Sequence, residues 1–473
     1  MTTTNGNRKI LDLKRWELCS FNSIATGAGS FSLLSRHVVQ TVMYFPPSLS
    51  TPYLYSVDED AFMPMVAHGL VNNPAAGSTG TATAFGASGT CPLNGTSTTV
   101  QVNESLARDL RGYKVRILAG PGAGDTRTIA SNTLSTITVT SAFSAAPTTG
   151  STYQLITPRF YVVCQASTAA ASFRMYDWAT NTWSTVTANA PASLSVDSKM
   201  VATPSFIGDD YKPFATGTAS AGGASTITDS TKNWATNQWA NSQVRITGGT
   251  GIGQIRTVSS NTSTAITVSA AWTTTPDATS TYAIEGNDDF LYLFGSGVNT
   301  TRRYQISTNT WTTLANRSGA TGAGLSGQWV YEVPDADWTA ESTIKNGRYI
   351  YSFRGGNVTS LDVYDIALNS WSTSSPASLS ALEVPTTGWK YSYGLDGIYC
   401  LPGAGGSPGG TRVYKFNVPK NQWEPFSHIH YLQSTAQVGD TMFNVSYKDG
   451  ATRIEYVYVM LNSSNVLMRC MVI

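Results

Sequence analysis

An internal duplication constrains the fold of this chain more than any other sequence feature. Residues 113–153 align with residues 242–282 at a constant offset of 129 positions, without a gap, and 19 of the 41 aligned pairs are identical. The identities include three glycine pairs and an arginine pair: Gly120 with Gly249, Gly122 with Gly251, Gly124 with Gly253, and Arg127 with Arg256. The sequence therefore predicts two copies of one folding unit, at about residues 77–157 and 215–285.

Each copy has the pattern of short β-strands. In the second copy, residues 244–246, 254–258 and 265–268 alternate apolar and polar side chains, which is the period of a half-buried strand. The three spaced glycines resemble a phosphate-binding loop, but a dinucleotide fingerprint needs a helix after the glycines and an acidic residue about 20 positions later. A β-pattern follows them instead, so we expect a tight hairpin in each copy and a small β-barrel or β-sandwich overall.

A second, shorter repeat surrounds the two copies. An aromatic residue precedes a tryptophan by seven positions, and an asparagine lies two positions before that tryptophan. The four instances are Tyr176–Asn181–Trp183, Tyr304–Asn309–Trp311, Tyr364–Asn369–Trp371 and Phe416–Asn421–Trp423. An apolar, strand-like run precedes each instance, and the repeating unit is about 50–60 residues long once the second copy of the duplication is removed.

This pattern resembles the kelch repeat, in which a hydrophobic strand, a glycine pair, a tyrosine and a tryptophan follow one another at fixed distances. The resemblance covers about residues 159–427, but the glycine pair, clearest at Gly355–Gly356, is weak in the first two instances, so the repeat is kelch-like. It implies an all-β chain in which each unit forms one four-stranded blade of a β-propeller. We expect the aromatic residue and the tryptophan on consecutive strands, with the asparagine in the turn and the rings between blades.

The two ends of the chain can complete this propeller. Residues 442–447, 454–461 and 466–473 are strand candidates, and residues 9–16, 38–45 and 53–57 supply further ones at the front. Pairing of an N-terminal strand with the last blade would remove free sheet edges. We expect six blades, with seven as the alternative. Residues 1–76, 158–214 and 286–473 would form the propeller, and residues 77–157 and 215–285 two homologous domains inserted in its loops.

Composition narrows the class of protein. Lys plus Arg is 30 and Asp plus Glu is 29, which argues against a protein that coats nucleic acid through unbalanced positive charge. Charged residues are only 12% of the chain while aromatic residues are 11%, so we expect a folded protein with a surface of Thr, Ser, Asn and Gly. No signal peptide and no transmembrane helix is expected, and the chain should be made in a cytoplasm. Five separated cysteines without a CxxC pair (Cys19, Cys91, Cys164, Cys400 and Cys470) are expected to be buried thiols.

The search for chemistry assigns no catalytic, cofactor-binding or metal-binding residue, and we expect no enzymatic activity. His428 and His430 could form a metal pair, but no third ligand is identifiable nearby in the sequence. The acidic groups at 58–60, 335–337 and 288–289 lack a loop signature and are expected to be exposed turn acids, the last directly before a strand. The segment 229–234 lacks the glycine of a sialidase Asp-box, and the glycine-rich loop 403–410 lacks the Lys of a P-loop.

The duplicated unit carries a second resemblance. Trp234, Trp239, the run 244–246, the spaced glycines and Trp272 with Pro276 resemble a small β-module of tailed-bacteriophage virion proteins; the first copy replaces both early tryptophans. Tail-nozzle subunits of short-tailed phages have a similar plan, a propeller with inserted β-barrel domains. The resemblance implies a structural virion subunit, made in the bacterial host cytoplasm, in a tail or nozzle ring.

The partners implied by this resemblance are copies of the chain itself and other virion proteins, such as a tail adaptor, portal-proximal proteins or fibres, with passive contact to passing DNA. A capsid decoration or fibre protein is the near alternative. A glycan-binding or glycan-cleaving propeller that recognises the host surface is the alternative of a different class, and it would need paired carboxylates in a cleft. An intracellular kelch adaptor would normally carry a partner domain, and none is expected from this sequence.

Overall fold

In the computed structural model of the chain, the described residues form β-strands and turns and contain no helix, which confirms the predicted all-β class. The structure describes residues 16–18, 30–33, 41–45, 53–56, 61–64, 79–83, 88–164, 172–186, 199–202, 213–294, 299–317, 329–331, 349–353, 361–374, 390–393, 398–401, 412–417, 421–428, 441–449, 452–461 and 466–472. The strands within these ranges form eight sheets, of which six have four strands each.

The six four-stranded sheets are built from neighbouring antiparallel strands. The first three along the chain are β2 (Ser30–Leu33), β3 (Thr41–Phe45), β4 (Tyr53–Ser56) and β5 (Ala61–Pro64); β6 (Thr79–Thr83), β13 (Arg159–Cys164), β14 (Ser172–Asp177) and β15 (Thr182–Thr185); and β16 (Lys199–Ala202), β24 (Phe290–Phe294), β25 (Thr301–Gln305) and β26 (Thr310–Thr313). The other three are β27 (Trp329–Tyr331), β28 (Tyr349–Phe353), β29 (Leu361–Asp365) and β30 (Ser370–Ser374); β31 (Lys390–Tyr393), β32 (Ile398–Leu401), β33 (Arg412–Asn417) and β34 (Gln422–His428); and β35 (Thr441–Asp449), β36 (Thr452–Leu461) and β37 (Val466–Val472) with β1 (Trp16–Leu18).

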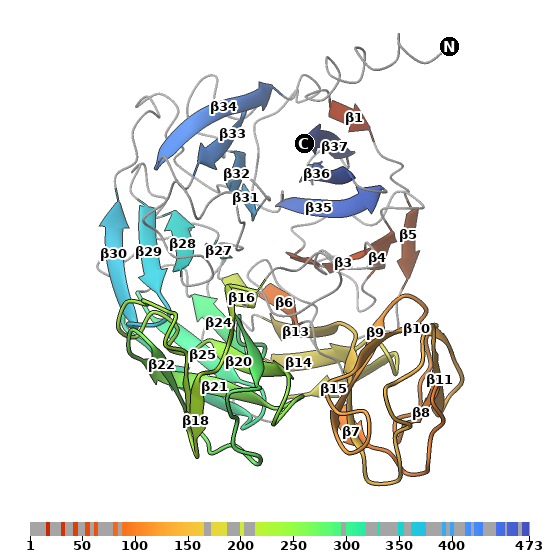
Figure 1. Ribbon diagram of the computed structural model, residues 1–473. Helices are drawn as coiled ribbons and strands as arrows, with labels where there is room; N and C mark the ends of the chain where they lie inside the picture. Colours follow the sequence, from red (N-terminus) through yellow and green to blue (C-terminus); the bar gives the residue numbers. More distant parts are fainter. Residues whose placement is uncertain are drawn as a thin grey trace, which may run out of the picture.

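These sheets follow one another around a circle (Figure 1). One edge strand of each sheet contacts an edge strand of the next, from β2 to β6, β16, β27, β31 and β35, and β35 contacts β2 again. Strand β1 pairs antiparallel with β37, so Trp16 lies opposite Cys470. An N-terminal strand therefore pairs in the sheet that contains the last described strand, as the sequence predicted.

The two remaining sheets are larger, and six strands of each follow the same order, while the second has one more strand at its edge. We call the six-stranded sheet β7 (Ser88–Thr90), β8 (Thr99–Gln101), β9 (Lys114–Ala119), β10 (Thr126–Asn132), β11 (Thr136–Val139) and β12 (Thr152–Ile156) the first module. The second module is β17 (Ala215–Thr218), β18 (Ala221–Gly223), β19 (Thr226–Thr228), β20 (Gln243–Gly248), β21 (Ile255–Asn261), β22 (Ala265–Val268) and β23 (Thr281–Glu285). Both curl around a buried apolar core, and they share the irregularities at Ile129/Ser131 and Val258/Ser260, which are equivalent positions.

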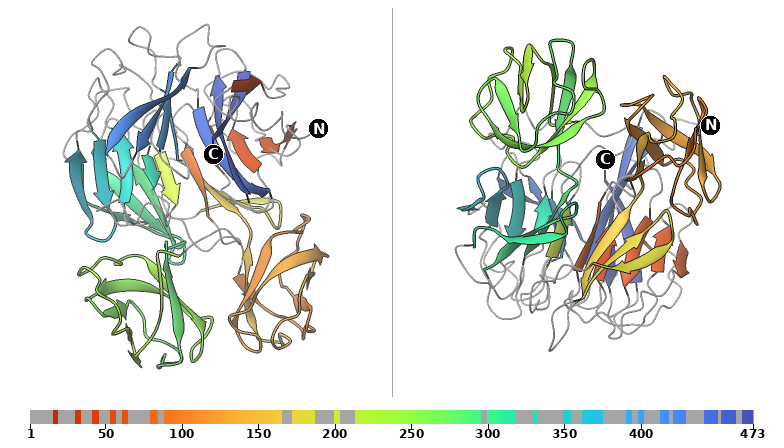
Figure 2. Two further views of the ribbon diagram at one scale, coloured as in Figure 1. Left: turned by 45° about the horizontal axis from the view of Figure 1, so that its top comes forward. Right: turned by 90° about the horizontal axis from the view of Figure 1, so that it is seen from below.

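Each module lies between two strands of a four-stranded sheet. The first module lies in the chain between β6 and β13, and these two strands pair with each other. The second module lies between β16 and β24, which also pair. Strand β6 thus belongs to a four-stranded sheet, although its residues fall within the range 77–157. Figure 2 shows both modules on the same side of the circle of sheets.

A buried tyrosine on the last strand of each module bonds to an acidic segment. The Tyr282 hydroxyl donates to Asp229 Oδ2 at 2.7 Å, and the equivalent Tyr153 hydroxyl contacts Asn103 and Glu104. Burial opposes the ionisation of Asp229, but hydrogen bonds from Thr231 and Tyr282 outweigh it and lower the pKa of this carboxyl. The segment 229–234 thus has a structural place inside the second module.

The aromatic–tryptophan repeat has one geometry in all four instances. Each aromatic residue lies directly opposite its tryptophan on the neighbouring strand, and the ring centroids are 5.0–5.2 Å apart. The turn asparagines have φ values of 54° (Asn181), 53° (Asn309), 49° (Asn369) and 48° (Asn421). This left-handed conformation suits asparagine better than other residues with a side chain, so the predicted Asn-containing turn is confirmed.

The repeat also connects neighbouring sheets. In the three instances with a tyrosine, its hydroxyl donates to the turn asparagine Oδ1 at 2.8 Å. Phe173 of β14 packs on Trp311 of β26 at 5.3 Å, and Phe294 of β24 packs on Trp371 of β30 at 5.9 Å. The rings therefore pack between sheets, as the sequence predicted.

We expect Asn309→Ala to lower the free energy of unfolding by about 1–3 kcal/mol, because alanine is strained at this φ and cannot accept the Tyr304 hydrogen bond. Asn309→Gly, the matched control, tolerates the φ and loses only the hydrogen bond, so it should cost about 1 kcal/mol. Urea unfolding curves of the two variants and the parent give the comparison. Equal losses for Ala and Gly would show that backbone strain at this turn is not the cause.

Candidate functional site

The residues singled out in the sequence do not come together as one site. His428 ends β34, while His430, the acidic groups 58–60 and 335–337 and the loop 403–410 lie outside the described residues. Asp288 and Asp289 form a turn directly before β24, as predicted, but both side chains are only partly exposed, which differs from the exposed acids expected there. Within the described ranges, no three His, Cys, Asp or Glu side chains lie together as a metal ion would require, and no helix is long and apolar enough to cross a membrane.

The spaced glycines form the turn between two antiparallel strands in each module. In the first module, Gly124 N donates to Ile117 O at 2.9 Å across the β9–β10 hairpin, and in the second, Gly253 N donates to Ile246 O at 3.0 Å across β20–β21. All six glycines have positive φ, from 71° at Gly249 to 93° at Gly120. A strand follows each turn, so the hairpin prediction is confirmed in both copies.

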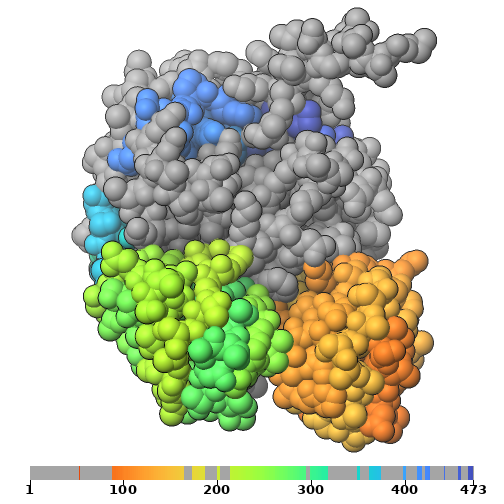
Figure 3. Space-filling model, in the orientation of Figure 1, coloured from red at the N-terminus to blue at the C-terminus, as the bar shows by residue number. Residues whose placement is uncertain are grey.

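These two hairpin turns touch each other. A Cβ placed on Gly124 would lie 2.3 Å from Ile252 Cγ1, and a Cβ placed on Gly253 would lie 2.9 Å from Gly124 N and 3.1 Å from Leu118 O. Neither position can accept a side chain without a shift of the other module. The absence of a Cβ at both positions therefore lets the two modules approach closely, and Figure 3 shows them adjoining at the surface.

Buried charged residues lie behind this turn contact. Arg116 of β9 is 1% exposed and Glu285 of β23 is fully buried. Arg245 Nε donates to Glu285 Oε1 at 2.7 Å. Burial lowers the pKa of Arg116 to about 10, the nearby charge of Arg245 acts in the same direction, and the carboxylates of Glu285 and Asp288 oppose both. A charged group of the first module is thus balanced by carboxylates supplied from the second module and the turn that follows it.

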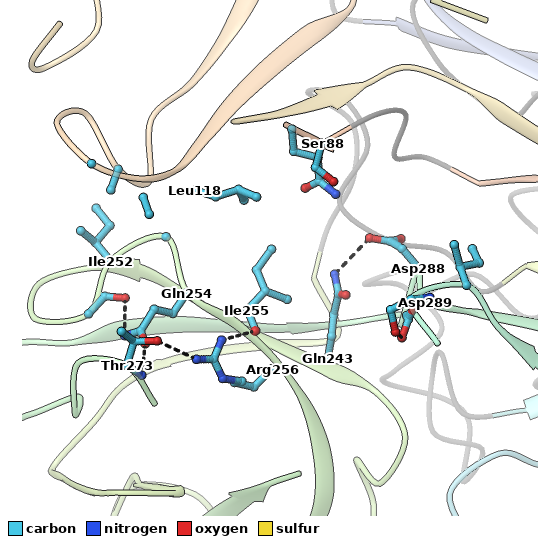
Figure 4. Close-up of a pocket in the computed structure, with 18 of the residues that line it drawn as sticks. Ser88, Leu118, Gln243, Ile252, Gln254, Ile255, Arg256, Thr273, Asp288 and Asp289 are labelled. Atoms are coloured by element: carbon cyan, nitrogen blue, oxygen red, sulfur yellow. Dashed lines mark hydrogen bonds between the residues drawn. The ribbon is translucent and has the colours of Figure 1, made fainter. Parts of the chain in front are cut away.

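Asp288 connects this cluster to the turn before β24. Burial raises the pKa of the Asp288 carboxyl well above its usual range, and the negative charge of Glu285 adds to this shift. Gln243 Nε2 donates to Asp288 Oδ2 at 3.3 Å, an interaction seen in Figure 4. The next residue, Asp289, accepts hydrogen bonds from Ser307 N and Oγ, both at 2.6 Å, and so fixes the turn against the β25–β26 connection.

Both modules are also attached to the four-stranded sheets. Ala107 N and Arg108 N donate to Ala179 O at 2.8 and 3.2 Å, and Arg108 lies over the Trp178 ring at 4.9 Å. In the second module, Asn241 Nδ2 donates to Ile366 O at 2.9 Å and its Oδ1 accepts from Arg303. Each module therefore meets a β-turn of a four-stranded sheet, at the connections β14–β15 and β29–β30.

A cavity of about 800 Å³ lies where the two modules meet the sheets of β13 and β24. Its walls carry amide, carboxylate and guanidinium groups, from Gln154, Gln243, Asp288, Asp289 and Arg159, beside apolar side chains such as Ile252 (Figure 4). Such a mixed lining suits a polar, uncharged ligand with both donors and acceptors. The lining residues include neither Cys nor His, so no thiol nucleophile or imidazole base is placed in this cavity.

Sequence reasoning did not identify Arg116, Glu285 or the cavity. A signal existed in the duplication: position 285 carries glutamate where the first copy has Ile156. Charge differences at positions equivalent by duplication can mark a surface between the copies. In the comparisons with known proteins, no family model and no curated protein matches the chain.

Proposed function

We propose that the chain is a structural subunit of a tailed-bacteriophage virion, as a component of a tail or nozzle ring. In this proposal the six four-stranded sheets are the blades of a kelch-like β-propeller, and residues 77–157 and 215–285 are two inserted domains. The propeller is supported by the contacts between edge strands of successive sheets, which run from β2 round to β35 and back to β2. The virion role is supported by the resemblance of the duplicated unit to a small β-module of tailed-bacteriophage virion proteins.

One observation carries the mechanical role: two copies of the same module pack side by side on one side of the circle of sheets. The sheets with their inter-sheet aromatic contacts make a stiff base, and the paired modules extend from it as one projection. Subunits in a closed ring contact their neighbours through two different faces. A projection on one side of a stiff body gives a subunit such unlike faces.

The proposed partners are copies of the chain, a tail adaptor, portal-proximal proteins and fibres, with passive contact to DNA that passes through the ring. The chain would be made in the bacterial host cytoplasm and assembled there into the virion. A capsid decoration or fibre protein has the same mechanical requirement at a different place in the particle.

The cavity favours a second candidate, a protein that binds host-surface glycans. Amide, carboxylate and hydroxyl groups line it together, and these are the groups that hydrogen-bond sugars. Glycan cleavage would additionally need two carboxylates roughly 5–10 Å apart on either side of a scissile bond. A binding assay with host-surface polysaccharide addresses this candidate directly.

Light scattering of the purified, untagged protein, alone and mixed with virions or tail components, tests the proposed function. We expect a ring-sized oligomer or capture by the particles. A strict monomer that ignores the particles but binds surface polysaccharide would refute the assembly role. Leu134 lies in the turn between β10 and β11 of the first module and is 64% exposed, so it allows the proposed projection to be tested. Leu134→Asp should weaken assembly if this turn contacts another subunit. Ser263→Asp, at the equivalent position of the second module, is the matched control.

A further inference from the structure

We infer that the two modules recognise each other as unlike partners, and that Glu285 is the residue that makes the second module the specific partner of the first. The inference concerns a surface between the modules and stands independently of the proposed virion role.

The contact has local two-fold character. Gly124 contacts Gly253, its equivalent at the offset of 129, and the charge of Arg116 acts on its equivalent Arg245. Equivalent residues meet across an interface only when a two-fold axis relates the two bodies. The duplicated modules therefore pack like the halves of a symmetric dimer, and this geometry by itself would serve two identical modules equally well.

The charges at the contact make the two modules unequal as partners. The positive charges of Arg116 and Arg245 act on each other across the contact, and Arg116 is 1% exposed, so these charges need nearby carboxylates. Glu285 bonds Arg245 within the second module and also balances Arg116 across the contact. In the first module, the position equivalent to Glu285 is Ile156.

Two equivalent positions at the contact show this difference directly. The first copy carries Arg116 and Ile156, with a formal charge of +1, and the second copy carries Arg245 and Glu285, with a formal charge of zero. Pairing of two first modules would bring two arginines together without a carboxylate. The second module supplies that carboxylate and is therefore the complementary partner of the first, while the pairing of two first modules is rejected.

The test uses the full-length chain and hydrogen–deuterium exchange at the two turns, residues 120–125 and 249–254. Glu285→Ile gives the second copy the residue that the first copy has at this position. It removes the carboxylate that balances the charges of Arg116 and Arg245. We expect exchange at both turns to increase by at least about tenfold, because removal of one partner of a buried charge cluster opens the contact. Asp109→Ile, which removes an exposed carboxylate of the first module, should leave both turns unchanged.

The double variant Ile156→Glu/Glu285→Ile moves the carboxylate to the equivalent position of the other copy. Because the contact is two-fold in character, Glu at 156 should balance both arginines from the opposite side, and exchange at the turns should return toward that of the parent. Exchange at β21 and β22 reports whether the second module is still folded; if Glu285→Ile unfolds it, the isosteric Glu285→Gln takes its place. Slow exchange at both turns in a folded variant without the carboxylate would overturn the inference, and so would failure of the double variant to restore the contact.

Discussion

Replacement of Trp371 by alanine should lower the free energy of unfolding by about 2–4 kcal/mol, somewhat less than for a fully buried aromatic side chain, because Trp371 is partly buried. The Trp371 ring lies 5.0 Å from Tyr364 within its own sheet and 5.9 Å from Phe294 of the neighbouring sheet. Its Nε1 donates to the backbone O of Ala315 at 2.9 Å, and Ala315 follows the last strand of the same neighbouring sheet. The substitution therefore removes packing and a hydrogen bond that join two sheets.

Denaturant unfolding monitored by circular dichroism measures this loss, and Trp371→Phe divides it into parts. Phenylalanine keeps an aromatic ring but cannot donate to Ala315 O, so it should cost about 1–2 kcal/mol. Hydrogen exchange at residues 290–294 should increase in the alanine variant and change little in the phenylalanine variant. A loss below about 1 kcal/mol for alanine would contradict a role for this ring in holding the sheets together.

Gly253→Ala should separate the two modules. Glycine here has φ +87°, and a Cβ would meet Gly124 N at 2.9 Å and Leu118 O at 3.1 Å, both backbone atoms that cannot rotate away. We expect a loss of about 1–2 kcal/mol from the left-handed backbone and a further loss of about 1–3 kcal/mol from the steric conflict. Unfolding curves give the total, and hydrogen exchange at residues 120–125 gives the response of the opposite module.

Gly150 offers a matched control for the backbone part. Its φ is +86°, but a Cβ there would meet nothing within 4 Å. Gly150→Ala should therefore show only the loss due to backbone strain and should leave exchange at residues 120–125 unchanged. If the two alanine variants lose equal free energy and neither affects residues 120–125, the close approach of the turns does not contribute to the pairing of the modules.

Local features of the fold could be predicted from the sequence because short-range chemistry determines them. The positive φ of Asn309 follows from the tolerance of asparagine for that conformation, and the opposition of Tyr304 and Trp311 follows from a two-strand hairpin of fixed length. The common strand order of the modules follows from the gapless register of the duplication. Cys91, Cys400 and Cys470 are buried, as predicted, and burial is the largest influence on the raised pKa of Cys91.

The contact between the modules could not be predicted in the same way. It depends on where β6, β13, β16 and β24 place two bodies in space, and no local pattern in either module encodes that placement. Arg116 and Arg245 are identical in the two copies and therefore look equally ordinary in the alignment. Only the structure shows that their charges act on each other and that the carboxylate of Glu285, in the second module, opposes the effect on Arg116.

The pairing of β1 with β37 has a consequence for the order of folding during synthesis. About 450 residues separate Trp16 from Cys470, which it opposes. At roughly 5–20 residues per second, a ribosome needs on the order of 20–90 s to make the partner of β1. Each module contains all the strands of its own sheet and can fold as soon as it leaves the ribosome. The sheet that contains β1 can be completed only after β37 has been made, so its formation should be the last and slowest step of folding.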